Sequence, residues 1–120
     1  MTDRPTAIDT TALDRLLDMT GGDLAFLDEL VDAYLEDAPA QLRAMRDAAE
    51  ANGAAELVRP AHSLKSNSAN MGAEALAEIC RSLEAAARGG KVADAVERVA
   101  AAETEFEVVR AALLGTRAGR

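Results

Sequence analysis

The chain has 120 residues and a formal net charge of −8, because 13 Lys and Arg stand against 21 Asp and Glu. This length fits one domain with a single modest core, and the acidic charge disfavours nucleic acid or an anionic membrane as a partner. Hydrophobic residues make up 49% of the chain but aromatic residues only 2%, and no run alternates as a strand would. We therefore expect an all-α protein.

The single cysteine, the N-terminal segment and the length of the apolar runs indicate the compartment of the protein. Cys80 has no second cysteine to pair with, so we expect it to pack as a small apolar residue. The N-terminal segment lacks the apolar core of a signal peptide, and no apolar run approaches the length of a membrane span. The sequence predicts a cytoplasmic protein with no membrane partner.

Two helices are predicted in the first half of the chain. The first covers residues 8–19 and ends at Gly21-Gly22, since glycine favours helix ends. Asp23 favours the start of the second, whose apolar residues recur with helical spacing until Asn52-Gly53. Pro39 falls inside this helix and predicts a bend or a break there, because its ring removes one backbone hydrogen bond.

Three further helices are predicted at about residues 54–71, 73–88 and 92–114, with glycines after each. A proline in the second turn of the first of them, Pro60, predicts a local kink before His62. The last helix is expected to bury one broad face and to be followed by a frayed end from Thr116. The residues of that face are Val92, Val96, Val99, Phe106, Val109 and Leu113.

Short connections between long amphipathic helices favour antiparallel neighbours. The predicted architecture is an up-and-down antiparallel four-helix bundle with a short extra helix at the N-terminus. We expect a single domain over residues 1–120 with its core at about 8–115. Because one bundle can bury its own apolar stripes, we expect a monomer. A start at Met1 with no long linker at either end favours a free-standing protein, and a domain cut from a hybrid kinase stays open as the alternative.

The stretch RPAHSLKSNSANMGA, residues 59–73, holds the single histidine of the chain. At about 100° per residue, His62 lies opposite an apolar face and is predicted to point to solvent. The opposite face comprises Leu57, Ala61, Leu64, Ser68 and Met71. The residues within about 60° of His62 are Val58, Arg59, Lys65, Ser66 and Ala69.

An exposed imidazole beside a cation is suited to phosphoryl chemistry. A ring nitrogen of His62 can attack phosphorus, and Lys65 can offset the negative charge that arrives. Two ordinary interpretations stay open, since most exposed histidines are plain surface residues and Lys65 can be a solvated helix lysine. The chain has no P-loop, no glycine-rich nucleotide motif and no carboxylate cluster for Mg²⁺, so we expect it neither to bind ATP nor to phosphorylate itself.

The run AHSLKSNSANMGAEALAEICRSLE, residues 61–84, resembles the signature of histidine-containing phosphotransfer (Hpt) domains. That signature reads A-H-x-L-K-G/S-S-small-A-N-x-G-A, followed by a leucine, a cysteine and L-E. Similar residues also occur at 13–17, in the Gly-Gly-Asp before Phe26, and in the Tyr34–Pro39 run. The resemblance covers nearly the whole chain.

The resemblance implies a phosphoryl carrier between the aspartates of receiver domains. His62 would be the phosphorylated residue, Lys65 would support the phosphoryl group, and Ser66 would stand where the family often has glycine. Val58, Arg59, Ser66 and Ala69 are the residues expected to meet the receiver. The implied partners are response-regulator receiver domains and a hybrid sensor kinase. No cofactor or metal is expected on this chain, and the receiver is expected to bring Mg²⁺.

Two other classes of protein remain possible from the sequence. A dimeric histidine-kinase hairpin also exposes a histidine, but the next residue there is typically acidic, whereas here it is Ser63. The second class is a helical adaptor that binds receiver domains without phosphoryl transfer, in which His62 would be incidental. Transfer of an acid-labile label to His62 distinguishes the two.

Overall fold

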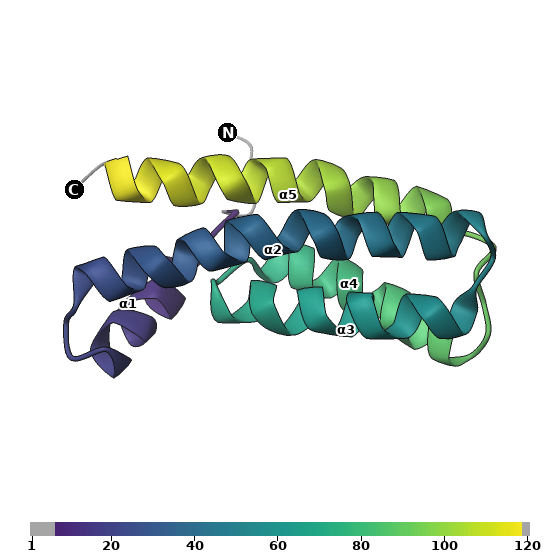
Figure 1. Cartoon of the computed structure of the whole chain (residues 1–120), viewed down its shortest axis with the longest axis horizontal. Helices are drawn as coiled ribbons and strands as arrows, with labels where there is room; N and C mark the ends of the chain where they lie inside the picture. The colour runs from purple at the N-terminus through teal and green to yellow at the C-terminus, as the bar shows by residue number, and fades with distance from the viewer. Residues whose placement is uncertain (1–6, 119–120) are drawn as a thin grey trace, which may run out of the picture.

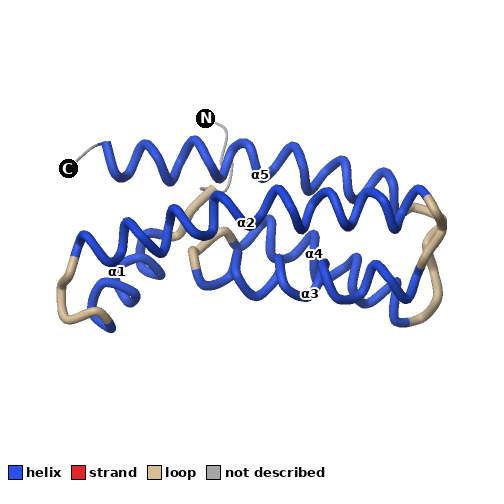
Figure 2. The backbone as a smooth tube through the Cα atoms, in the orientation of Figure 1, coloured by secondary structure: helices blue, strands red, loops and turns tan. Residues whose placement is uncertain are grey.

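The computed structural model describes residues 7–118, and in this range it is all-helical, without strands (Figures 1 and 2). The prediction of an all-α protein with five helices is therefore confirmed. The helices are α1 Thr10–Met19, α2 Leu24–Glu50, α3 Ala54–Asn70, α4 Glu74–Arg88 and α5 Ala95–Ala118. None of the helices in this range is both long and apolar enough to cross a membrane.

The four longer helices lie alongside one another and enclose the core (Figure 1). Helix α3 packs against α2 and α4, and α5 closes the arrangement by packing against α2 and α4 as well. The short α1 lies at one end, where it contacts α2 and α3. Because α3 and α4 share the most extensive contact, a side chain on the outer face of one can reach the other.

The ends of the helices follow the sequence signals. Asp23 caps α2, since its side chain accepts a hydrogen bond from the backbone N–H of Phe26 at 3.0 Å. After α3, Gly72 adopts φ +78°, a conformation that favours glycine, and its carbonyl accepts a hydrogen bond from Asp9 N at 2.8 Å. A Cβ on Gly72 would collide with the Asp9 carbonyl oxygen. This glycine lets the segment before α1 lie against the α3–α4 turn.

Neither internal proline interrupts its helix. Helix α2 runs unbroken from Leu24 to Glu50 through Pro39, so the predicted break does not occur, although the helix visibly changes direction along its length (Figure 1). Helix α3 likewise continues through Pro60, which is buried. Packing along the full length of each helix outweighs the one hydrogen bond that each proline removes.

The buried face of α3 is the one that helical spacing predicts. Leu57, Ala61, Leu64 and Ser68 are fully buried, and Met71 is nearly so. The hydroxyl of Ser68 forms a buried hydrogen bond of 2.8 Å with the Tyr34 hydroxyl of α2. These contacts fix the rotation of α3 about its axis, and with it the direction of the residues on the opposite face.

Helix α5 differs from its prediction in register and in length. Val96 is exposed, so the prediction that it belongs to the buried face is wrong. Val92 packs half-buried against the core as predicted, but it lies before the helix rather than in it. The buried stripe instead starts at Ala95, three and four residues apart through Leu113: Ala95, Val99, Ala102, Phe106, Val109 and Leu113. The helix also continues past Thr116, where fraying was expected, because Arg117 pairs with Asp32 of α2 at 2.6 Å.

Candidate functional site

His62 lies in the middle of α3 and faces solvent. Its side chain is 53% exposed, which confirms the orientation predicted from the helical wheel. The residues that share this face of α3 with His62 are half-buried or exposed. Val58 is half-buried against the core, and Lys65 is 28% exposed. Arg59, Ser66 and Ala69 are exposed.

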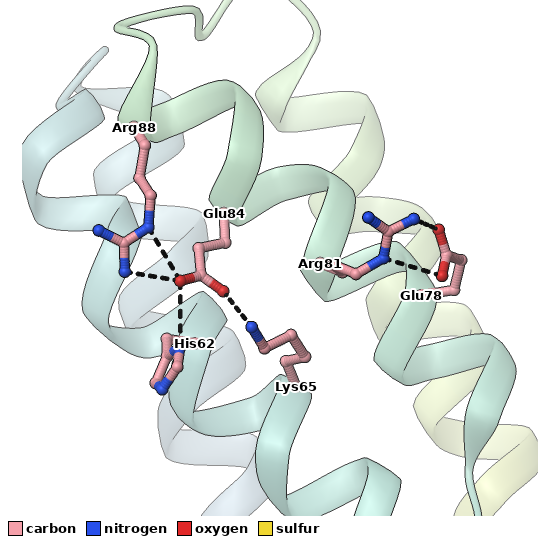
Figure 3. A network of polar contacts seen from close by, with 6 residues as sticks. All are labelled: His62, Lys65, Glu78, Arg81, Glu84 and Arg88. Carbon is pink, nitrogen blue, oxygen red and sulfur yellow. Dashed lines mark hydrogen bonds and ion pairs between the residues drawn. The ribbon is translucent and has the colours of Figure 1, made fainter.

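Glu84 of α4 meets this face of α3 and contacts His62 directly. Its Oε2 lies 3.0 Å from Nδ1 of His62, and its side chain is only 7% exposed (Figure 3). Glu84 shares the inward side of α4 with Cys80, Leu83 and Ala87, so its carboxylate emerges at the α3–α4 contact. A buried carboxylate is stable only when it is paired and hydrogen-bonded.

Two cations supply that pairing. Nζ of Lys65 lies 2.7 Å from Oε1 of Glu84, and Arg88 donates to Oε2 through Nε at 3.0 Å and Nη2 at 2.7 Å. Figure 3 shows that Lys65 and His62 come from α3, whereas Glu84 and Arg88 come from α4. We call these four residues the His62 cluster.

The charges of the His62 cluster keep Glu84 ionised. The contact with Lys65, aided by those with Arg88 and His62, lowers the pKa of the Glu84 carboxyl from 4.5 to about 2 although burial opposes this. With a neutral imidazole, two cations and one carboxylate leave a local charge of about +1. In a chain with a net charge of −8, the cluster is thus a local site favourable to an anion.

The contact with Glu84 decides which ring nitrogen of His62 is nucleophilic. An ionised carboxylate can only accept hydrogen bonds, so the neutral imidazole must donate its N–H from Nδ1. The lone pair then resides on Nε2, which points away from Glu84 in Figure 3. The arrangement presents a solvent-facing nitrogen nucleophile whose tautomer and ring orientation are held by a fixed carboxylate.

Glu84 and Arg88 were not among the site residues predicted from the sequence. The signal for Glu84 is a single charged residue on the apolar face of its helix, next to Leu83 and four residues after Cys80. The signal for Arg88 is its position four residues after Glu84, where helical side chains of opposite charge pair. Neither signal predicts that Glu84 contacts His62, which lies on the other helix.

Two other kinds of site, a metal site and a reactive thiol, can be compared with residues 7–118 of the structure. No group of three or more His, Cys, Asp or Glu side chains in this range could hold a metal ion. Cys80 is buried, as predicted, and burial raises the pKa of its thiol to about 12. The thiol is therefore protonated and is not a nucleophile at neutral pH.

Comparison with known proteins identifies the family of the chain. The family model of the Hpt domain matches residues 29–112, well over half of the chain. Among solved structures, the chain is similar to the crystal structure of histidine-containing phosphotransfer protein B (HptB) from Pseudomonas aeruginosa PAO1. The two share 31% sequence identity and a TM-score of 0.87, and the alignment covers 98% of this chain and 99% of that one. No curated protein sequence matches the chain significantly.

Proposed function

The chain belongs to the Hpt domain family, and from that premise we propose that His62 is the residue on which it carries the phosphoryl group. Members of this family are phosphoryl carriers rather than catalysts, and they interact with receiver domains and kinases of two-component systems. The protein is accordingly a histidine phosphotransfer protein of a phosphorelay. The contact of Nδ1 of His62 with Glu84 carries the assignment, because it leaves Nε2 free as a nucleophile.

In the proposed transfer, the lone pair of Nε2 attacks the phosphorus of an aspartyl phosphate on a receiver domain. The Nε2–P bond forms, the P–O bond breaks, and its electron pair leaves with the aspartate oxygen. The Nδ1 proton remains hydrogen-bonded to Glu84, which stabilises the positive charge that the ring acquires. The reverse sequence passes the phosphoryl group to an aspartate of a second receiver.

The partner supplies the remaining chemistry in this proposal. Mg²⁺ held by the receiver would stabilise the charge on the phosphoryl oxygens, and the described residues of this chain offer no cluster for it. This chain contributes the nucleophile, its orientation and a locally positive surface. A hybrid sensor kinase and a response regulator are the proposed partners, and the carrier is proposed to act as a monomer.

We infer that α2, α3, α4 and α5 form an up-and-down antiparallel four-helix bundle with α1 as an added helix. The inference is supported by the short loops between these helices and by the packing of each one against two others. We also infer one Hpt domain whose core spans about residues 8–115. The buried Ile8 and Leu113 near the two ends of this range support that extent.

The proposed function is tested with a receiver domain carrying radiolabelled aspartyl phosphate. We expect the purified protein to acquire a label that is acid-labile and alkali-stable, and that maps by mass spectrometry to the peptide containing His62. A protein that binds the receiver without acquiring label would instead be an adaptor.

Lys65→Ala should slow transfer or shorten the lifetime of the phosphorylated state without abolishing acceptance. Lys65 supports the phosphoryl charge in our proposal, whereas the imidazole of His62 forms the bond. Its removal should leave the fold intact because Arg88 still neutralises Glu84. Label acceptance and melting temperature should be measured together, and a large loss of stability would show that Lys65 is a structural residue instead.

Ser66→Trp should weaken receiver binding and transfer while leaving thermal stability near that of the parent. Ser66 is exposed one turn after His62, and a bulky ring there would keep the receiver from approaching Nε2. Ala69→Arg should have a smaller effect of the same kind, and Ser66→Gly should be tolerated at a cost of up to about 1 kcal/mol in helix stability. Titration of each variant with its receiver measures the effect, and unchanged binding by Ser66→Trp would place the docking face elsewhere.

A further inference from the structure

Glu84 is held by two cations although one would balance its charge. Lys65 approaches Oε1 from α3, and Arg88 approaches Oε2 from the last residue of α4 (Figure 3). The two oxygens are thus neutralised from different helices. Oε2 also accepts the hydrogen bond from Nδ1 of His62, so Arg88 and the imidazole meet on one atom.

After phosphorylation of His62, Lys65 would have two anionic partners, the phosphoryl group and the carboxylate of Glu84. To support a phosphoryl group on Nε2, its ammonium must turn away from Oε1 of Glu84, which it contacts at 2.7 Å. Glu84 is 7% exposed, and a buried carboxylate that loses its counter-ion is strongly destabilised. Lys65 can therefore leave only if another cation stays.

Arg88 satisfies that requirement. Two of its nitrogens contact Oε2 of Glu84, and this pairing does not involve Oε1, so it can persist when Lys65 moves. A guanidinium remains charged at all relevant pH values. Its two N–H groups, held in one plane, fix the position of the carboxylate oxygen that accepts from them. Arg88 also sits at the C-terminal end of α4, where the helix dipole favours a cation.

We propose that Arg88 is a positioning residue, the permanent counter-ion of Glu84 that releases Lys65 to the phosphoryl group. This inference rests on the proposed roles of His62 and Lys65. As the Nε2–P bond forms and the P–O bond of the donor breaks, Lys65 turns to the phosphoryl oxygens. Arg88 keeps Glu84 neutralised, and Glu84 keeps the Nδ1 proton. Arg88 acts through Glu84 and makes no contact with the phosphoryl group.

The test uses a receiver domain that phosphorylates the parent protein, and it measures the equilibrium ratio of phosphorylated His62 to phosphorylated receiver. Arg88→Gln should shift this ratio about tenfold toward the receiver, within the range of couplings in one ion-pair network. Arg88→Lys should stay within about twofold of the parent because it retains the charge. Arg81→Gln is the matched control, since Arg81 is an equally exposed arginine of α4 whose partner is Glu78 (Figure 3). It should leave the ratio unchanged.

The same substitution in a Glu84→Gln background distinguishes positioning from direct contact. A neutral amide needs no counter-ion, so Arg88→Gln should then cause no further shift. A full shift in that background would show that Arg88 acts on the phosphoryl group itself, and an unchanged ratio for Arg88→Gln alone would show no role; either result overturns the inference. A parent that receives no phosphoryl group on His62 overturns the proposed function, and melting curves identify any variant that is unfolded.

Discussion

His62→Gln should abolish phosphoryl acceptance and leave the helical fold intact. The substitution removes the ring nitrogen that forms the bond to phosphorus, and the chain has no second histidine to replace it. The side chain is 53% exposed and lies outside the core, so the free energy of unfolding should change by less than about 1 kcal/mol. Label transfer from a phosphorylated receiver and a denaturant titration measure the two effects separately.

The receiver should still bind the His62→Gln variant, because the surface around position 62 is unchanged. A variant that binds and does not accept label separates a lost nucleophile from a lost interface. If the variant retained acid-labile label at the parental level, the phosphoryl group would be on another residue and the assignment of His62 would be wrong.

The free energy of unfolding should fall steeply as the pH drops from about 4.5 to about 2. The pKa of Glu84 is lowered from 4.5 to about 2 in the folded protein, mainly by Lys65. A carboxyl with a lowered pKa stabilises the fold at pH values above its unfolded pKa, and this stabilisation disappears as the pH falls through its folded pKa. The shift corresponds to at most about 3 kcal/mol, so protonation of Glu84 should be among the largest single contributions to acid unfolding.

Glu84→Gln is the control for this pH dependence, because it removes the titrating group and keeps the shape of the side chain. Glu78 and Glu103 also have lowered pKa values, but they titrate in both proteins. The difference in unfolding free energy between parent and variant should therefore be at its largest, and constant, above about pH 5, and its pH-dependent part should be lost once the pH falls below about 2. A difference that does not vary with pH would show that the pKa of Glu84 is the same in the folded and the unfolded protein, so that the His62 cluster does not lower it.

Helical periodicity in the sequence was sufficient to orient the phosphoryl-accepting candidate. Leu57, Ala61 and Leu64 recur on one side of α3, and burying that side forces His62 outward whatever the neighbouring helices are. The caps and glycines indicated the bounds of α1 to α4 for a similar reason, since they act locally through backbone hydrogen bonds, whereas α5 continues past Gly115. Features that depend on one helix alone were predictable.

Features that depend on how two helices pack could not be predicted from the sequence. The contact between His62 and Glu84 depends on how α3 and α4 are rotated and offset against each other, which neither helix determines alone. The sequence also could not show that packing would carry α2 through Pro39 without a break. In α5, two positions of the buried stripe are the small residues Ala95 and Ala102, so the apolar pattern favoured Val96, one residue away from the true face.

The position of the phosphoryl group on the imidazole tests the central claim most directly. After transfer from a receiver to the ¹⁵N-labelled protein, NMR couplings between phosphorus and the ring nitrogens identify the nitrogen that is bonded. We predict phosphorus on Nε2 of His62, with Nδ1 still carrying the proton that it donates to Glu84. Phosphorus on Nδ1, or on any residue other than His62, would contradict the account.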